Sequence, residues 1–573
     1  MAVRAKKFLY GIGKYVPPLE SREEKIKLDF NENTEGPGQK VMKALGGGVM
    51  KTLNQYPEYR GFNEKIAEYA RVKPSQIIAT NGSDEAIKLV FESFASENEE
   101  VIIPQPSFAL FAIYAQFVGA KIKKPLYNAD FSYPLERVLK AITRKTKVVV
   151  VCDPNNPTGT SLRNSGIEKI AKKTKNGVVL VDEAYFEFSG KTAVPIIKKC
   201  GNVIVTRTFS KAFGLAALRV GYLVADEELA SVMLRAQSPY PVNRLAKIAA
   251  ETALGDTRYM ESYVRKVDRN RKRMEKFFSE NGIRFVKSDS NFMLIELNSS
   301  KQLFLNELEK SNILVRDISK YPLLSGKIRI TVGDDEKTKK VLDAIKSALK
   351  KPVLIFDIDG TLVETSSSYD VAIKKTFEKF AGKKISLEEI RLTRNREAIN
   401  SDWKITHELL IRSGKNPAME KVVQEFQKFY LGKNFSGLIL KERLLLPKST
   451  ITELSGKYSL AIFTGRPRKE AEFALKKFGI LDCFSEILCM EDVPKNLEKP
   501  DPFGINLIKK RFAAKKYIYF GDTTADAKAA HRAGIESAII MPKGLGKNSA
   551  KMFREAGAGR MFKRITEAVK VIK

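Results

Sequence analysis

The sequence predicts an α/β protein with two consecutive units, each built on a parallel-rich sheet. First, a chain of 573 residues is too long for one hydrophobic core. Second, between residues 100 and 226 short β-branched apolar runs alternate with helical segments, as in a parallel sheet covered on both faces. Third, an amphipathic Lys-rich helix ends near Lys350, Pro352 follows, and a new apolar strand, VLIF, begins. We therefore predict one domain over residues 1–350 and another over residues 351–573.

The composition, 43% hydrophobic and 29% charged, is typical of a soluble globular protein. No apolar run reaches membrane-spanning length and the first residues lack a signal-peptide core, so we expect a cytoplasmic protein without membrane contact. The net charge of +33 is unusual, but the lysines are spread over helical segments instead of forming a basic arm. We expect this charge to attract anionic substrates, and we do not expect nucleic-acid binding.

Polar side chains stand at the ends of three predicted strands in the first unit. Asn156 follows TKVVVVC, Asp182 with Tyr185 ends the next strand, and Ser210 with Lys211 ends the third. Ligands of open α/β sheets bind at the carboxyl ends of strands, so these groups should converge on one crevice. Pyridoxal 5'-phosphate needs this set: an amine that holds it as a Schiff base and then moves protons, an acid beside the pyridine nitrogen, and hydrogen bonds to the ring oxygen.

A phosphate site is predicted beside that amine. Arg219 and Ser210 would bind the cofactor phosphate, because a planar guanidinium suits a phosphate group. The strand-turn-helix segment QIIATNGSDEAIKLVFESF places Gly82 and Ser83 at a helix N-terminus, where free N–H groups favour an anion. The alternative for this turn is a helix cap without a ligand.

The first 350 residues resemble the fold-type I pyridoxal-phosphate aminotransferases, and within them histidinol-phosphate aminotransferases most closely. The resemblance lies in the motifs NENT, YP, NGSDE, PNNPTG, DEAYFEF, TFSKAFGLAALRVGY and ILVRDISKYPLLSGKIRITVG. It implies the roles given above, with Lys211 as the Schiff-base lysine. It also implies that Tyr56 reaches the cofactor phosphate of another subunit, and hence a homodimer with shared sites. Phe108 stands where the family usually has a tyrosine against the cofactor ring; it can stack there without the hydroxyl group.

The same resemblance implies how substrates are bound. Arg329 would clamp the α-carboxylate of glutamate, and Arg316 with Tyr15 would meet the phosphate of a phosphorylated substrate. The alternative for both arginines is ordinary surface charge, since the chain contains 100 lysines and arginines.

The second unit begins with the motif DIDGT after an apolar strand. Asp357 and Asp359 are two positions apart, so both can face the same side of an extended segment. Asp357 would attack phosphorus to form an aspartyl phosphate. Asp359 would protonate the leaving oxygen and then activate water.

Further motifs supply the other groups that phosphoryl transfer needs. Thr464 at a strand end and Lys499 in EKPDP would hold the phosphoryl oxygens. Oxygen ligands suit Mg²⁺, and the candidate metal-site carboxylates are Asp357, Asp359, Asp522 and Asp526. The unit resembles the phosphatase branch of the haloacid-dehalogenase superfamily, which implies a Rossmann-like domain and a helical cap over about residues 366–446.

Together the two resemblances imply a bifunctional enzyme of histidine biosynthesis. Transamination between imidazole-acetol phosphate and glutamate would give histidinol phosphate and 2-oxoglutarate, and Mg²⁺-dependent hydrolysis would then release histidinol. One alternative is an aminotransferase of aromatic or other specificity, or a threonine-phosphate decarboxylase, fused to a phosphatase of unrelated specificity. Another is that the second unit is an idle binding or dimerisation module.

Overall fold

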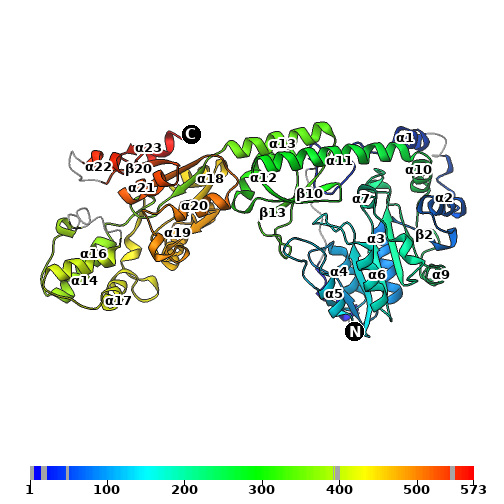
Figure 1. Cartoon of the computed structure of the whole chain (residues 1–573), viewed down its shortest axis with the longest axis horizontal. Coiled ribbons are helices and arrows are strands. Elements are labelled where there is room, and N and C mark those ends of the chain that lie inside the picture. The colour runs from blue at the N-terminus through cyan, green and yellow to red at the C-terminus, as the bar shows by residue number, and fades with distance from the viewer. Residues whose placement is uncertain are drawn as a thin grey trace. The chain divides into compact units, whose positions relative to one another are not determined.

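The computed structural model describes residues 5–13, 22–46, 51–390, 393, 401–542 and 549–572. The chain divides into two compact units (Figure 1). The first runs to Lys301 and includes Glu307–Ile345, and the second comprises Gln302–Asn306 and the chain from Lys346 onward. Both units contain helices and sheets, which confirms the predicted α/β class. No helix in the described ranges is long and apolar enough to cross a membrane.

A seven-stranded mixed sheet forms the centre of the first unit. Its strands, in spatial order, are β2 (Ile77–Thr80), β8 (Gly221–Val224), β7 (Val203–Thr208), β6 (Val178–Asp182), β5 (Thr146–Cys152), β3 (Glu100–Ile102) and β4 (Lys121–Lys123). The strands from β7 to β4 are mutually parallel, whereas β8 runs antiparallel to both β7 and β2. The predicted parallel-rich sheet is thus present, with one reversed strand near its edge.

Helices cover this sheet on apolar faces. Val148 and Val150 of β5 and Leu180 of β6 join one buried cluster with Phe91 of α3 and Phe111 of α4. Alternate strand residues supply this face because side chains alternate along a strand. The helices up to Lys350 are α1 (Gln39–Gly46), α2 (Arg60–Ala70), α3 (Gly82–Phe94), α4 (Ala109–Phe117), α5 (Leu135–Ala141), α6 (Asn164–Lys173), α7 (Phe186–Ser189), α8 (Val194–Ile197), α9 (Glu227–Leu234), α10 (Arg244–Leu254), α11 (Thr257–Glu280), α12 (Lys301–Lys310) and α13 (Asp335–Lys350).

A smaller antiparallel sheet follows the long helix α11. Its order is β12 (Arg316–Asp317), β13 (Lys327–Thr331), β10 (Phe292–Glu296) and β9 (Arg284–Val286). The short strand β1 (Ile26–Lys27) pairs in parallel with β11 (Ile313–Leu314). This pairing ties the segment that contains NENT to the segment that contains Arg316.

The second unit is built on a six-stranded parallel sheet. Its order is β18 (Glu486–Leu488), β17 (Ser459–Phe463), β14 (Val353–Phe356), β19 (Tyr517–Gly521), β20 (Glu536–Ile540) and β21 (Arg560–Phe562). In β14, Leu354 and Phe356 enter one buried cluster, and Val353 and Ile355 enter another. The strand VLIF is therefore apolar throughout because both of its faces are covered. The helices of this α/β core are α18 (Lys448–Lys457), α19 (Arg468–Lys477), α20 (Phe503–Arg511), α21 (Thr524–Arg532), α22 (Ser549–Glu555) and α23 (Ile565–Lys570).

Most of the described segment between β14 and β17 consists of helices. Two short strands, β15 (Val363–Glu364) and β16 (Arg443–Leu444), pair antiparallel at its two ends. Between them α14 (Tyr369–Ala381), α16 (Asp402–Arg412) and α17 (Met419–Tyr430) share a buried cluster of their own. This segment overlaps residues 366–446, the predicted cap. Short 3-10 turns occur at Lys7–Gly11, Pro74–Gln76, Ala216–Leu218, Asn298–Ser300, Lys433–Phe435, Leu438–Lys441, Leu481–Cys483, Met490–Asp492 and Lys495–Leu497.

The central strand β14 generates a stability prediction. Phe356 is 1% exposed, and its ring stacks on Phe520 at 4.5 Å and meets Phe484 edge-on at 6.2 Å. We expect Phe356→Ala to lower the free energy of unfolding of the second unit by about 3 to 5 kcal/mol, because it leaves a cavity between neighbouring strands. Urea unfolding followed by hydrogen exchange of β14 and β19 measures the loss. Leu440→Ala is the control: Leu440 is 50% exposed, so a comparable loss there would contradict the cavity explanation.

Candidate active sites

Asp182 lies at the carboxyl edge of the large sheet, on a strand flanked by two parallel neighbours. The register pairs it with Cys152 of β5 and Thr206 of β7. The Thr206 hydroxyl donates a hydrogen bond of 3.1 Å to Asp182 Oδ1. Burial raises the pKa of Asp182 to about 7. No cationic side chain of the described residues forms an ion pair with it, so a cationic ligand atom beside this carboxyl group would be favoured.

Lys211 lies close by, after β7. Its Nζ donates a hydrogen bond of 2.8 Å to the carbonyl oxygen of Phe30 and is 5.8 Å from the centre of the Tyr185 ring. Burial of the amine lowers its pKa to about 8, and the positive charge of Arg329 acts in the same direction. Part of Lys211 still reaches solvent. An accessible lysine that is partly neutral near physiological pH suits covalent chemistry with a carbonyl compound.

Arg329 and Asn156 complete the cluster around Lys211. Arg329, on β13, donates to Asn156 Oδ1 at 2.5 Å and also to the carbonyl oxygen of Asp29. Its side chain is buried, and Nε has no hydrogen-bond partner among the described residues. The hydroxyl group of Tyr185 accepts a hydrogen bond of 2.9 Å from Asn31 Nδ2. A buried guanidinium with a free N–H can still bind an anionic ligand group.

The predicted phosphate groups gather at the start of α3. Arg219 NH1 is 3.4 Å from Ser210 Oγ, and Arg219 NH2 pairs with Asp84 Oδ2 at 2.8 Å. Gly82 has φ +76°, and a Cβ atom there would be 2.7 Å from Arg219 NH2. Glycine at this position therefore lets the guanidinium approach the helix N-terminus, where Ser83 lies in the first turn. Asp84 is not among the residues predicted from the sequence, although the motif NGSDE contains it.

The remaining predicted residues differ in their placement. Arg316 pairs in register with Arg329, and its guanidinium is 5.9 Å from the Phe30 ring, so it lies beside Arg329 on the small sheet. Phe108 precedes α4 and packs edge-on against Phe111. Tyr56 is 76% exposed and stacks on Tyr240 at 4.2 Å. Tyr15 lies outside the described residues.

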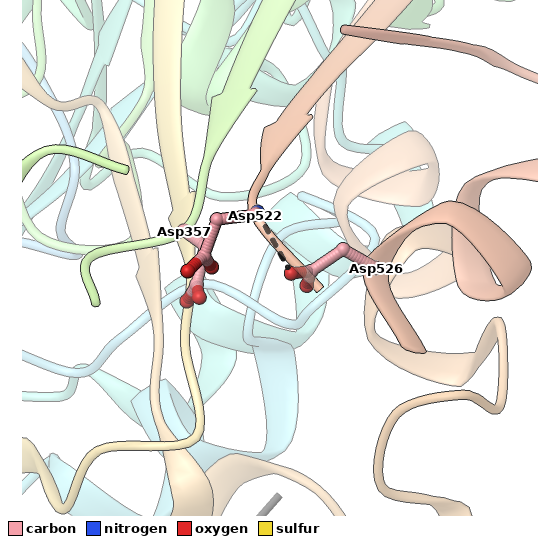
Figure 2. A group of neighbouring side chains, drawn as sticks. All are labelled: Asp357, Asp522 and Asp526. Carbon is pink, nitrogen blue, oxygen red and sulfur yellow. Dashed lines mark hydrogen bonds between the residues drawn. The ribbon is translucent and has the colours of Figure 1, made fainter. Parts of the chain in front are cut away.

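In the second unit, three acidic side chains meet at the carboxyl edge of the parallel sheet. Asp357 follows β14, Asp522 follows β19, and Asp526 lies in the first turn of α21. One carboxylate oxygen from each lies within 4.8 Å of the other two, and the side chains lie close together in Figure 2. Because β14 and β19 are parallel neighbours in register, their following residues emerge side by side.

The charges in this cluster are only partly balanced. Lys499 Nζ is 2.8 Å from Asp526 Oδ1 and 3.2 Å from Asp357 Oδ1. Burial acts to raise the pKa of Asp526, but Lys499 lowers it overall. Burial raises the pKa of Asp357 to about 7 despite Lys499. Burial and the carboxylates of Asp526, Asp357 and Asp359 hold the pKa of Asp522 well above its usual value. Asp522 Oδ1 has no hydrogen-bond partner within the described chain.

This surplus of negative charge fits a divalent cation bound by oxygen atoms. Asp357 and Asp522 carry the unbalanced charge, whereas Asp526 also accepts hydrogen bonds from the Tyr519 and Thr523 hydroxyl groups. The tight turn after Asp357 contributes to the site: Gly360 has φ +66°, and any Cβ atom there would overlap Asp522 Oδ2. The glycine of DIDGT therefore makes room for the Asp522 carboxylate.

Asp359 does not join this cluster. Its Oδ1 accepts hydrogen bonds from Arg466 Nε at 2.8 Å and from Arg466 NH2 at 2.5 Å. Thr464, predicted to hold phosphoryl oxygens, is buried after β17, and its Oγ1 lies 3.3 Å from Arg466 N. Arg466 is not among the residues predicted from the sequence. The sequence signal for it was the motif TGRP, which follows the apolar strand ending at Phe463 and contains Arg466 as its third residue.

Comparison with known proteins identifies one family for each unit. Residues 23–345 match the family model of aminotransferase class I and II, and residues 354–540 match that of haloacid dehalogenase-like hydrolase. The histidinol-phosphate aminotransferase of Caldanaerobacter subterraneus subsp. tengcongensis is 36% identical over 338 residues, which cover 58% of this chain and 95% of that protein.

Solved structures show the same likeness. The structure of the histidinol-phosphate aminotransferase from Clostridium acetobutylicum aligns with a TM-score of 0.52 and 27% identity, covering 56% of this chain and 98% of that one. That from Sinorhizobium meliloti, in complex with pyridoxal-5'-phosphate, aligns with a TM-score of 0.55 and 22% identity, covering 61% and 98%; at this identity the likeness concerns the fold alone.

The lowered pKa of Lys211 predicts a pH dependence. Only a neutral amine adds to a carbonyl group, so covalent addition of pyridoxal phosphate to the apo protein should become faster with rising pH, with a midpoint at about 8. Borohydride reduction and mass spectrometry of the Lys211 peptide measure this rate. Exposed lysines in the same digest are the internal control. A midpoint near 10.5, the ordinary lysine value, would show that the amine is not desolvated.

The contact between Gly360 and Asp522 predicts the effect of an added methyl group. Gly360→Ala should destabilise the second unit by about 1 to 3 kcal/mol through its positive φ, and it should displace Asp522 from the cluster. We therefore expect the rise in melting temperature on adding Mg²⁺ to disappear in this variant. Gly456→Ala in α18 is the control, since its Cβ atom would meet no neighbour within 4 Å. If Gly360→Ala still responds to Mg²⁺ as the wild type does, the cation does not depend on Asp522.

Proposed function

This chain belongs to the class I and II aminotransferases and carries a haloacid dehalogenase-like hydrolase behind that domain, and from this we propose that it catalyses two consecutive reactions of histidine biosynthesis. Residues 1–350 would transfer an amino group from glutamate to imidazole-acetol phosphate, giving histidinol phosphate and 2-oxoglutarate. Residues 351–573 would hydrolyse histidinol phosphate to histidinol and phosphate with Mg²⁺. The observation that carries the proposal is that one chain contains both the Lys211 cluster and the Asp357 cluster.

Lys211 and Asp182 are the central groups of the first reaction. Pyridoxal phosphate, when bound, supplies an electron-withdrawing ring that stabilises negative charge at the substrate α-carbon. Lys211 would hold the cofactor covalently and, once released by the substrate, would move a proton to or from the substrate α-carbon. Its pKa of about 8 leaves a usable fraction of neutral amine. Asp182 would bind the protonated pyridine nitrogen, and this contact would balance its buried charge.

Other residues of the first unit would orient the cofactor. Asn156 and Tyr185 would contact the ring oxygen, and Phe108 would face the ring. The phosphate would be bound by the N-terminus of α3 and by nearby side chains, namely Gly82, Ser83, Ser210 and Arg219. Tyr56 would reach the phosphate held by a second copy of the chain, so we propose a homodimer. The high exposure of Tyr56 supports this role.

Two arginines on neighbouring strands suit two substrates that each carry an anionic group, the carboxylate of glutamate and the phosphate of the ketone. Arg329 would bind the α-carboxylate of glutamate, and its unpartnered Nε supports this assignment. Arg316, its register partner on β12, would bind the phosphate of the phosphorylated substrate together with Tyr15. Glutamate and the phosphorylated ketone would use the site in turn, with Arg329 binding the carboxylate of glutamate and Arg316 binding the phosphate of the ketone.

The second reaction would proceed in two steps at Asp357. In the first, an Asp357 oxygen forms a bond to phosphorus, the ester P–O bond breaks, and Asp359 gives its proton to the departing alcohol. In the second, Asp359 takes a proton from water, the water oxygen attacks phosphorus, and phosphate leaves Asp357. Thr464 and Lys499 would hold the phosphoryl oxygens. Asp357 and Asp522 would bind Mg²⁺, which neutralises phosphoryl charge, and Asp526 would hold Lys499.

A product analysis tests the two-step proposal. Purified protein is given imidazole-acetol phosphate, glutamate, pyridoxal phosphate and Mg²⁺. The amounts of 2-oxoglutarate, histidinol phosphate, histidinol and inorganic phosphate are then followed together. We expect histidinol and phosphate from the wild type, no reaction with Lys211→Ala, and accumulation of histidinol phosphate with Asp357→Asn, because its amide is a far weaker nucleophile. Transamination without cleavage of histidinol phosphate would assign the second unit to another ester. No transamination at all would favour another amino-acid or decarboxylase specificity for the first unit.

The proposed role of Arg316 has its own test. Losing one charge-assisted contact should raise the KM of the Arg316→Met variant for imidazole-acetol phosphate by about 10- to 100-fold and leave the KM for glutamate nearly unchanged. Arg284→Met is the matched control, because Arg284 lies on the same small sheet and its side chain is 80% exposed. An equal rise for both substrates would mean that Arg316 supports the site as a whole instead of recognising phosphate.

A further inference from the structure

Arg466 uses all of its hydrogen-bonding capacity on three side chains. Nε and NH2 donate to Asp359 Oδ1, NH1 and NH2 donate to the two carboxylate oxygens of Glu442 at 3.1 and 3.2 Å, and NH1 donates to the Tyr430 hydroxyl group at 3.3 Å. The arginine is 1% exposed. A guanidinium has five N–H groups, and these contacts engage all five. None is left for a substrate phosphate in this arrangement.

The same contacts leave the two oxygens of Asp359 in different states. Oδ1 accepts two N–H groups from Arg466, whereas Oδ2 receives no hydrogen bond from any described residue. The side chain of Asp359 is 34% exposed, so its free oxygen can be reached by a ligand. An oxygen that already accepts two hydrogen bonds from a cation is a poor place for a proton. A proton on Asp359 would therefore sit on Oδ2.

Arg466 also connects the α/β core to both ends of the helical segment between β15 and β16. Glu442 immediately precedes β16, and its Oε1 accepts hydrogen bonds from Ser368 and Tyr430. Tyr369, the first residue of α14, places its ring 5.3 Å from the guanidinium carbon. Glu442 and Tyr430 are almost completely buried. The orientation of Asp359 is thus linked to the position of this segment.

We propose that Arg466 is a positioning residue for phosphoester hydrolysis, which orients Asp359 so that Oδ2 delivers the proton to the leaving oxygen, and that Glu442 and Tyr430 hold Arg466 in place from the helical segment. The inference rests on the proposed hydrolase function. It assigns no contact between Arg466 and the substrate. The electron and proton balance is that of the first step above: the Asp357–phosphorus bond forms, the ester P–O bond breaks, and the proton moves from Asp359 Oδ2 to the alcohol.

Leaving groups of different basicity provide the test. An alkoxide needs a proton to leave, whereas p-nitrophenolate leaves without one. We compare kcat/KM of the full-length wild type and Arg466→Lys for histidinol phosphate and for p-nitrophenyl phosphate with Mg²⁺. The value of kcat/KM reflects only the steps up to alcohol release, so the later hydrolysis of the aspartyl phosphate does not affect it. A lysine ammonium cannot reproduce the planar contacts to Asp359 and Glu442 together.

We expect Arg466→Lys to lower kcat/KM for histidinol phosphate on the order of 10²-fold, the usual range of a lost general acid, and to lower it far less for p-nitrophenyl phosphate. The Mg²⁺ concentration for half-maximal activity should not change, because Arg466 does not belong to the cluster formed by the three carboxylates and Lys499. Glu442→Gln keeps the size of the side chain. It should also lower kcat/KM more for histidinol phosphate than for p-nitrophenyl phosphate, but by a smaller factor than Arg466→Lys. It also serves as the second variant if Arg466→Lys does not fold.

Arg468→Lys is the matched control, because Arg468 begins α19 two residues later and pairs with Asp492 instead of Asp359. Arg468→Lys should leave the ratio of kcat/KM for histidinol phosphate to kcat/KM for p-nitrophenyl phosphate unchanged. Equal losses for both esters in Arg466→Lys and Glu442→Gln would show a purely structural role and overturn the proposal, as would no loss at all. If the wild type cleaves p-nitrophenyl phosphate but not histidinol phosphate, the pathway assignment fails, and the best-cleaved alkyl phosphate decides the role of Arg466. If it cleaves no ester, the hydrolase function and this inference fail together.

Discussion

Asp182 and Asp357 each stand at the end of a strand whose two neighbours run parallel to it, and in each case burial raises the pKa of the carboxyl group to about 7. Parallel strands carry helices on both faces, so the carboxyl edge of the sheet is the place where polar side chains of neighbouring strands can meet. A carboxyl group held there is desolvated and needs a cation, which a ligand or a metal ion can supply. The other residues of both sites are arranged around this requirement.

The two lysines show how the same side chain serves different chemistry. Lys211 contacts a backbone carbonyl oxygen and has Arg329 nearby, so burial and repulsion lower its pKa and leave it partly neutral. Lys499 is also buried, but Asp526 and Asp357 lie within 3.2 Å, and they raise its pKa and keep it charged. A neutral amine suits covalent chemistry, and a fixed cation suits the binding of phosphoryl oxygens. The surroundings of the nitrogen, not the residue type, separate the two roles.

A chain with both proposed activities would also have a thermodynamic consequence. Transamination exchanges one amine and one carbonyl for another such pair, so it is close to thermoneutral, whereas hydrolysis of a phosphate ester is effectively irreversible in water. Removing the phosphate would draw the first reaction forward whether or not the intermediate leaves the protein. The charges of the two sites are consistent with this order. Arg316 and Arg329 together suit a phosphorylated substrate with a second anionic partner, and the acidic cluster with Lys499 suits the proposed cleavage of a phosphoester bond.

The sequence alone predicted the α/β class and the polar residues that end the strands, because both depend on local patterns. Apolar β-branched runs predict buried strands, and a polar residue directly after such a run must lie at the sheet edge wherever the strand is placed. Asp357 and Asp522 directly follow such runs, and Lys211 and Asn156 lie three and four residues beyond theirs, so the sequence around each of them indicated its place.

Only the tertiary structure decided which side chains pair with one another. Arg466 and Asp359 are separated by 107 positions and Arg219 and Asp84 by 135, and no local pattern connects them. The direction of β8 within the large sheet is likewise set by packing and not by its own four residues. An ion pair forms between chain segments that meet only after the sheet has assembled. The sequence could therefore name most charged residues of both sites but not their pairing, and it did not indicate Asp84 or Arg466.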